Sequence, residues 1–155
     1  MIQVAFYDTA EDSVFDFAVI IAKKDGKWLL CRHKERTTWE FPGGHREKGE
    51  RIEDAARREL FEETGAKDYT LQPICAYSCM KQGGDASFGM LYYADVKELG
   101  ALPAFEIRET RLFDALPDRK DFWTYPDIQP FLLRKVRELD IKSVSYTHLT
   151  LPTIA

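Results

Sequence analysis

Residues 43–66 read GGHREKGERIEDAARRELFEETGA and hold the pattern that decides the fold. Glu59, Glu62 and Glu63 are spaced so that a helix places their carboxylates on one side. Like charges at these spacings destabilise a helix by roughly 0.2–0.5 kcal/mol per pair. A solvated helix face is the ordinary interpretation of such a stretch, but a cation bound between the carboxylates would remove their repulsion. The segment therefore indicates a metal site.

The oxygen-only character of this cluster predicts which metal it takes. Carboxylate ligands select hard cations, Mg²⁺ first, with Mn²⁺ as a substitute. Gly43 and Gly44 let the loop backbone approach the metals closely, and the Gly43 carbonyl could complete the coordination. Such metals bridge phosphate oxygens, offset their charge and lower the pKa of a bound water, which then attacks phosphorus.

Upstream positions make the pattern specific. From Gly44 the segment is G-x5-E-x7-R-E-L-x-E-E-x-G-A, with Glu50, Arg58 and Gly65 at fixed positions. It resembles the Nudix box, G-x5-E-x7-R-E-U-x-E-E-x-G-U, in which U is a bulky aliphatic residue, and departs from it only at the small Ala66. The resemblance implies an α/β/α sandwich around a mixed β-sheet. It also implies hydrolysis of a nucleoside diphosphate linked to another moiety.

The same resemblance implies a role for each residue of the box. Glu59, Glu62 and Glu63 would hold the metal, and either Glu59 or Glu63 would serve as the base. Arg58 would orient a carboxylate. Glu50 would pair with a cation and, with the two fixed glycines, maintain the loop-helix shape.

Composition limits the remaining possibilities. The chain has 155 residues, which suits one domain. A net charge of −4 and a pI of about 5.4 argue against a nucleic-acid polymer as partner. Three cysteines without paired spacing indicate free thiols in a reducing compartment. Neither a signal peptide nor an apolar run of about 18 residues is present, so we expect a cytoplasmic protein that does not enter a membrane. The oligomeric state stays open.

The rest of the chain alternates between strand and helix patterns. Apolar runs at 14–22 and 28–32 flank the turn Lys24-Asp25-Gly26, which predicts a β-hairpin before the loop-helix. Helix formers follow from Ile52, and Gly65 stands where a glycine ends a helix. Further strands are predicted at 69–80, 87–99 and 106–116, and a last helix from about Asp127. The order β-β-α-β-β-β-α is that of a mixed α/β domain.

The last residues differ from the rest. VSYTHLTLPT, at 144–153, is similar to a translated adapter used in sequencing libraries. We expect residues 1–143 to form the domain and residues 144–155 to be a non-native tail, with a genuine β-rich tail as the alternative.

Candidate substrate contacts lie outside the box. Arg32 and Arg46 belong to a local excess of cations that could attract a polyphosphate, unless they only solvate a strand end and a loop. A nucleobase would need an apolar or aromatic slot. The candidates for it, each with the alternative of an ordinary core residue, are Trp39, Phe41, Tyr77 and Trp123. Of these, Trp123 lies in a polar stretch that is hard to bury, where it could cap the site.

A further acid is expected late in the chain, because many Nudix proteins place one on a late loop. Glu109 is preferred over Glu106, and the alternative is that both are ordinary exposed strand residues.

The substrate is predicted by analogy. Nudix proteins that cleave ADP-ribose often carry a proline about sixteen residues after the box, and Gln82 stands near that place. WLLCRHKERTTWEFPGG and YYADVKEL look most like bacterial nucleoside triphosphate pyrophosphohydrolases, some of which act on 8-oxo-dGTP. The alternatives are hydrolysis of ADP-ribose or of a dinucleoside polyphosphate, and a sensor that binds a nucleotide without cleaving it. The variant Glu63→Gln separates a hydrolase from a sensor, because a hydrolase loses turnover and a sensor keeps its affinity for the nucleotide.

Overall fold

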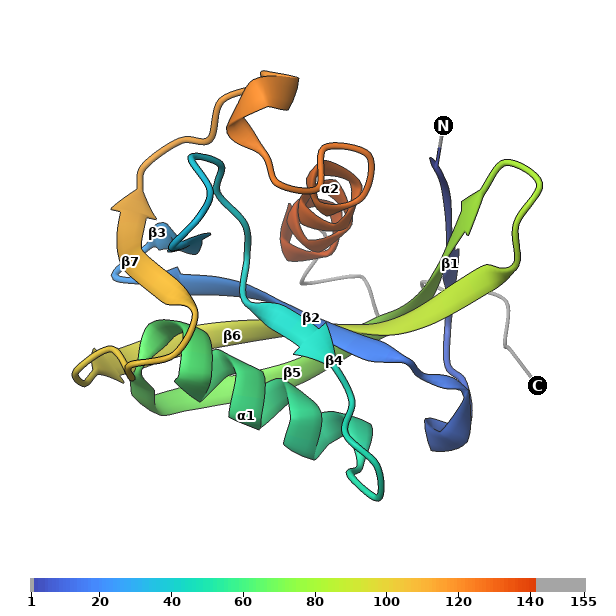
Figure 1. Ribbon diagram of the computed structural model, residues 1–155, viewed down its shortest axis with the longest axis horizontal. Coiled ribbons are helices and arrows are strands. Elements are labelled where there is room, and N and C mark those ends of the chain that lie inside the picture. The colour runs from blue at the N-terminus through green and yellow to red at the C-terminus, as the bar shows by residue number, and fades with distance from the viewer. Residues whose placement is uncertain (1, 142–155) are drawn as a thin grey trace.

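The computed structural model describes residues 2–141, and the expected tail at 144–155 lies outside them. Within the described range a seven-stranded sheet is covered by one helix on each face (Figure 1). The strands are β1 (Ile2–Tyr7), β2 (Phe17–Lys24), β3 (Lys27–His33), β4 (Gly43–His45), β5 (Ala66–Lys81), β6 (Ala86–Leu99) and β7 (Ile107–Phe113). The helices are α1 (Ile52–Thr64) and α2 (Gln129–Ile141), with short 3-10 turns η1 (Asp12–Val14) and η2 (Lys120–Phe122). The predicted α/β/α sandwich is confirmed.

One edge of β2 pairs with two different strands of the sheet. The strand order is β1-β5-β6-β2-β3-β7, and only β2 and β6 run parallel. The first half of β2 pairs with β4 and its second half pairs with β3. The predicted hairpin joins β2 to β3 through Asp25 and Gly26, whose φ angles of 53° and 76° suit a tight turn. The glycines of β4 are thereby fixed against the centre of the sheet.

Alternation along β2 supplies two cores, one for each helix. Ala18, Ile20 and Ala22 face a cluster that includes the buried side of α1, whereas Val19 and Ile21 face a second cluster that includes α2. All five are buried, as expected for a strand covered on both faces. The two cores hold α1 and α2 on opposite sides of the sheet.

Both ends of α1 are fixed. Gly65 adopts the left-handed conformation, φ 76°, and its N–H donates to the Phe61 carbonyl at 2.8 Å, as the sequence predicted for a helix end. At the start of the helix, the N–H of Ile52 donates to Asp12 Oδ1 at 3.0 Å. Asp12 lies in η1, so a remote segment caps the helix in place of the adjacent Arg51, whose side chain makes no cap.

Two strands were not predicted from sequence. β1 pairs antiparallel with β5, which runs from Ala66 and is longer than predicted. β4 consists only of Gly43, Gly44 and His45, a composition with no strand preference, and it exists because β2 offers it an edge. None of the helices in residues 2–141 is long and apolar enough to cross a membrane.

Candidate active site

The double glycine lies directly against the acidic face of α1. The N–H of Gly43 donates to Glu63 Oε1 at 2.8 Å. A Cβ atom at Gly44 would come within 2.6 Å of the Glu59 carboxyl carbon, closer than any side chain tolerates. At Gly43 a Cβ atom would instead come within 2.5 Å of the Ala18 carbonyl oxygen on β2, so Gly44 allows the approach to α1 and Gly43 the approach to β2.

Glu63 is a buried acid with little positive charge around it. Only 8% of the residue is exposed. Burial, the largest cause, and the negative charges of Glu59, Glu40 and Glu106 together raise its pKa to about 9, against the Gly43 N–H, which lowers it. Burial also raises the pKa of Glu59, although Arg58 opposes that shift. The site holds acidic groups whose ionisation a divalent cation would favour.

Arg58 ties the loop to the helix. Its Nε and Nη2 atoms donate to the two oxygens of Glu50 at 2.7 and 3.0 Å, a bidentate pair, and Nη2 also donates to the His45 carbonyl at 3.1 Å. Through this pair Arg58 lowers the pKa of Glu50. The remaining Nη1 donates to Glu59 at 2.7 Å and to Glu62 at 3.3 Å. The structure thus pairs Glu50 with a cation and places Arg58 against two carboxylates, and the roles that the resemblance implied for them stay predictions.

The donor set fits Mg²⁺ in chemistry. Three carboxylates from one helix, one of them buried with a raised pKa, form an oxygen-only set beside the glycines of β4. Within residues 2–141, no three potential ligands converge on one point, because the Arg58 guanidinium lies against Glu59 and Glu62. A bound cation would require these carboxylates to turn toward Glu63. The proposed role of the Gly43 carbonyl stays a prediction.

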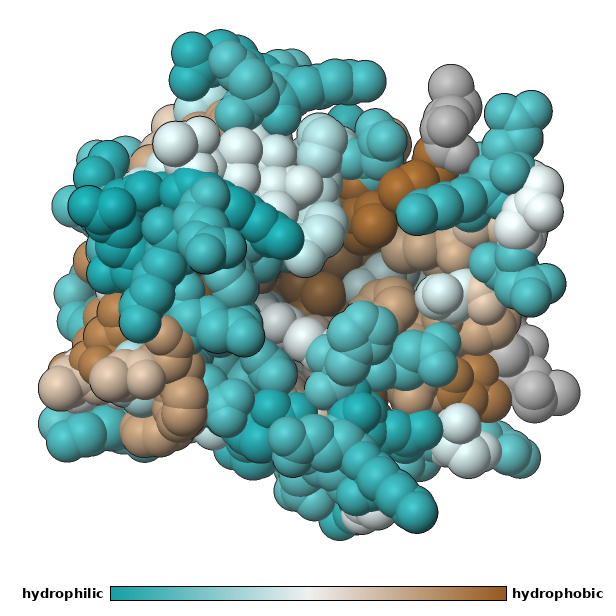
Figure 2. Space-filling model, in the orientation of Figure 1, coloured by the Kyte–Doolittle hydropathy of each residue, from teal (hydrophilic) through white to brown (hydrophobic). Residues whose placement is uncertain are grey.

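A small cavity adjoins the acidic face. It has a volume of about 200 Å³ and lies where β2 and β4 meet the start of α2. Figure 2 shows a hollow with hydrophobic residues near the centre of the molecular face that is turned to the viewer. The lining residues are Phe17, Ala18, Val19, Glu40, Phe41, Gly43, Gly44, His45, Tyr77, Tyr125, Ile128 and Gln129. The hydroxyl of Tyr77 is fully buried and has no hydrogen-bond partner among the described residues. Tyr77 therefore contributes to the cavity wall while its hydroxyl stays inaccessible to solvent.

Two polar residues of this cavity were missed by sequence reasoning. Glu40 is only 4% exposed, and its pKa is raised by burial despite Arg36 nearby. Gln129 is 2% exposed, and its amide oxygen accepts the N–H of Phe41 at 2.7 Å. The available signal for Glu40 was an acidic residue between two aromatic ones in WEFPGG. Gln129 gave no signal, because its partner lies far away in the sequence.

Of the predicted base-binding residues, the structure brings Phe41 and Tyr77 to the cavity and leaves Trp39 and Trp123 outside its lining. Trp39 lies beside the guanidinium of Arg111, 4.9 Å from the ring centre. The expectation that Trp123 is hard to bury is wrong. It is 5% exposed in the core beside α2, and its Nε1 atom donates to the Pro117 carbonyl at 3.2 Å.

The predicted cations are both paired. Arg32 Nε donates to Glu109 at 3.1 Å, which lowers the pKa of Glu109 and engages the preferred further acid. Glu106 keeps a side chain that is 77% exposed, and its charge is among those that raise the pKa of Glu63. Glu106 also has a partner, because His33 Nε2 lies 3.4 Å from its carboxylate, and the choice of Glu109 or Glu106 as the further acid stays a prediction.

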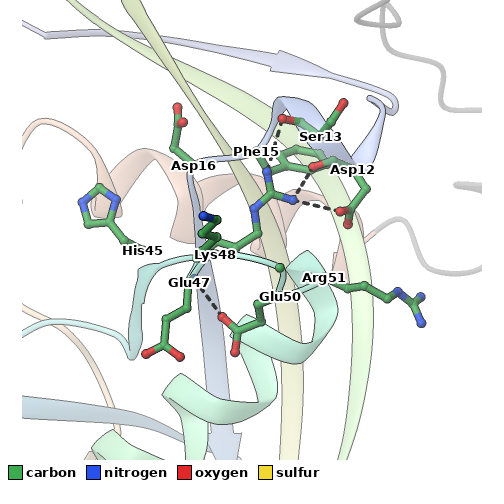
Figure 3. A pocket seen from close by; sticks show the side chains of 11 residues that line it. Asp12, Ser13, Phe15, Asp16, His45, Glu47, Lys48, Glu50 and Arg51 are labelled. Carbon is green, nitrogen blue, oxygen red and sulfur yellow. Dashed lines mark hydrogen bonds and ion pairs between the residues drawn. The ribbon is translucent and has the colours of Figure 1, made fainter.

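Arg46 lines a separate and more open hollow of about 600 Å³. Its Nη1 atom donates to the Asp12 carboxylate at 2.8 Å, and Nη2 donates to the Ser13 carbonyl at 3.2 Å. Figure 3 shows η1, with Asp12 and Ser13, beside the loop that carries Glu47 and Lys48. In this structure Arg46 joins η1 to the loop, and η1 in turn caps α1.

Comparisons with known proteins agree with this geometry. The family model described as NUDIX domain matches residues 13–126. A Bacillus subtilis protein, YtkD, named provisionally as an 8-oxo-dGTP diphosphatase, is 31% identical over 144 residues, which is 88% of this chain and 90% of that protein. An RNA pyrophosphohydrolase of Caulobacter vibrioides is 45% identical over 56 residues, about a third of each chain.

Among solved structures, the Bacillus subtilis pyrophosphohydrolase BsRppH superposes with a TM-score of 0.74 at 32% identity. The superposition covers 88% of this chain and 90% of that one.

Proposed function

The chain belongs to the Nudix family and is a hydrolase of phosphoanhydride bonds, and on that premise we propose that it cleaves a nucleoside triphosphate to the monophosphate and pyrophosphate. The observation that carries this proposal is the 200 Å³ cavity that shares Gly43 and Gly44 with the acidic site. Ligand pockets for whole drug-sized molecules measure roughly 300–1,000 Å³. This smaller, mostly apolar cavity suits a single nucleobase whose phosphates extend toward α1.

Nudix hydrolases generally depend on divalent metals, and we propose Mg²⁺ held by Glu59, Glu62 and Glu63. When bound, such ions offset phosphate charge and lower the pKa of water. The chain itself supplies the remaining functions. Glu63, or Glu59, accepts the proton of the attacking water while the bond from phosphorus to the pyrophosphate oxygen breaks. The Gly43 N–H fixes Glu63, and Arg58 fixes Glu59.

An oxidised guanine nucleotide is our preferred substrate, because the similarity to YtkD extends over most of both chains. Removal of pyrophosphate from a 5′-triphosphorylated RNA is a second candidate, favoured by the similarity to the Caulobacter RNA pyrophosphohydrolase. Both reactions break the same kind of bond, so the acidic site serves either one. The two candidate substrates differ in size, because the rest of an RNA chain would have to extend out of the cavity.

A substrate panel tests this proposal. The full chain is incubated with Mg²⁺ and separately with dGTP, 8-oxo-dGTP, dATP, ADP-ribose, a dinucleoside tetraphosphate and a 5′-triphosphorylated RNA, and the products are separated by ion exchange. We expect monophosphate and pyrophosphate, fastest from 8-oxo-dGTP, and no reaction with a chelator. Turnover of ADP-ribose alone would contradict the triphosphate assignment. Nucleotide binding without any turnover would indicate a sensor.

A further inference from the structure

Glu40 is the sole acidic residue among the described residues that line the cavity. It comes to this position because its backbone pairs with Cys31, through Cys31 N–H to Glu40 O at 2.8 Å and Glu40 N–H to Cys31 O at 3.0 Å. The backbone polar groups are therefore satisfied, and the side chain alone is available to a ligand. A buried carboxylate is unfavourable without hydrogen-bond donors around it, so its presence calls for a reason.

The protein supplies Glu40 with few donors. Arg36 Nη1 approaches at 3.4 Å from a side chain that is 44% exposed, and the Thr124 hydroxyl donates a second hydrogen bond. A carboxylate has about four acceptor positions and no donor when ionised. Glu40 thus keeps acceptor capacity inside a mostly apolar cavity.

The other polar groups of the cavity are arranged differently. Both polar atoms of the Gln129 amide bind the backbone of Phe41. The amide oxygen accepts the Phe41 N–H at 2.7 Å, and the amide nitrogen donates to the Phe41 carbonyl at 3.4 Å. The Tyr77 hydroxyl has no partner. A ligand entering the cavity would therefore meet one acidic acceptor, Glu40, whereas the Tyr77 hydroxyl is buried in the cavity wall.

Guanine presents the complementary edge. Its N1–H and its 2-amino group are two adjacent donors, which match the two oxygens of a carboxylate. Adenine offers one donor and one lone pair on the corresponding edge, and a carboxylate would repel that lone pair.

We infer that Glu40 selects guanine over adenine by accepting hydrogen bonds from N1–H and the 2-amino group, an inference that rests on the nucleoside triphosphate function proposed above. Oxidation at C8 leaves this edge unchanged in the keto form. Glu40 consequently contributes equally to dGTP and 8-oxo-dGTP and sets the base, not the oxidation state.

The test compares purines in the wild-type chain and in Glu40→Gln. A glutamine offers one acceptor and one donor, which suit adenine better than guanine. We expect the wild type to favour dGTP over dATP in kcat/KM by about tenfold or more, and Glu40→Gln to abolish or reverse that preference. Glu98→Gln, at an exposed position of β6, is the matched control and should keep the wild-type ranking.

Two measurements keep the inference independent of folding and of turnover. In the wild type, dITP, which lacks the 2-amino group, and the 2-aminopurine nucleotide, which lacks N1–H, should each react more slowly than dGTP. Calorimetric binding of dGMP and dAMP reports the same preference without hydrolysis. A wild type that does not distinguish guanine from adenine, or a folded Glu40→Gln with an unchanged ranking, overturns the role of Glu40. Absence of all triphosphate hydrolysis refutes the proposed function instead, and dGMP binding then still decides the role of Glu40.

Discussion

At the scale of single residues, Glu63 combines burial, one backbone hydrogen bond and several negative neighbours. Burial and the negative neighbours are unfavourable for an ionised carboxylate in the absence of a cation, and they raise its pKa to about 9 although the Gly43 N–H opposes that shift. A residue kept in this condition is typical of a functional site. Its titration and its replacement give two predictions.

The first concerns pH and stability without metal. The unfolded chain releases the Glu63 proton near pH 4.5, whereas the folded chain holds it up to about pH 9. Between these values the folded state binds more protons, so the free energy of unfolding should fall as pH rises and level off above about 9. Urea titrations from pH 5 to pH 9 with a chelator measure this slope, and Glu63→Gln should reduce it. An unchanged slope in that variant would contradict the assignment.

The second concerns turnover. Glu63→Gln keeps the shape of the side chain and removes its capacity as a proton acceptor and as an anionic ligand. We expect kcat to fall by between about a hundredfold and ten-thousandfold, with nucleotide binding largely kept. Glu98→Gln serves again as the control. Steady-state kinetics beside calorimetric binding separates lost chemistry from lost affinity, and a variant with normal kcat would exclude Glu63 from catalysis.

At the scale of elements, the loop from His45 to Glu50 and helix α1 act as one unit because Arg58 joins them. Arg57, its neighbour on the same helix, makes an exposed pair with Glu53 and an exposed contact with the Tyr69 hydroxyl at 3.4 Å. Arg58→Ala should lower the free energy of unfolding by about 1.5–3 kcal/mol, and Arg57→Ala by less than about 1 kcal/mol. Arg58→Lys cannot form the bidentate pair and should also lose activity. Equal effects at both positions, measured by denaturant unfolding, would show that Arg58 has no special role.

The approach of β4 to α1 gives a further prediction. Gly44→Ala would push the Glu59 carboxylate away, since the added Cβ would lie 2.6 Å from it. A displacement of this kind costs about a hundredfold in rate. Gly84→Ala, in the turn between β5 and β6, meets only an ordinary contact at 3.5 Å and is the control. Kinetics and thermal unfolding of both variants check the result, and normal activity in Gly44→Ala would contradict the close packing.

Elements also show how far the sequence was informative. The β2–β3 hairpin and the end of α1 were predicted because Asp25-Gly26 and Gly65 are local conformational signals. β4 was not, because its three residues become a strand only by pairing with β2. The cavity was missed for the same reason, since Gln129 meets Phe41 across most of the chain. Long-range contacts of this kind leave no periodic trace.

At the scale of the whole molecule, the sandwich brings two sites to one edge of β2. The α1 face supplies acids, and the α2 face supplies an apolar cavity, with the glycines of β4 between them. This division explains why the box alone predicts hydrolysis and leaves the substrate open. The chemistry lies on one local segment, whereas substrate selection depends on residues gathered from several elements.

The central claim is that these two sites together cleave a nucleoside triphosphate at its α–β bond. The most direct test is a reaction of dGTP or 8-oxo-dGTP in ¹⁸O-water with Mg²⁺, with the products analysed by mass spectrometry. We predict equal amounts of nucleoside monophosphate and pyrophosphate, one of which carries the label, and no reaction in Glu63→Gln. Formation of nucleoside diphosphate and phosphate, or unchanged nucleotide, would contradict the account.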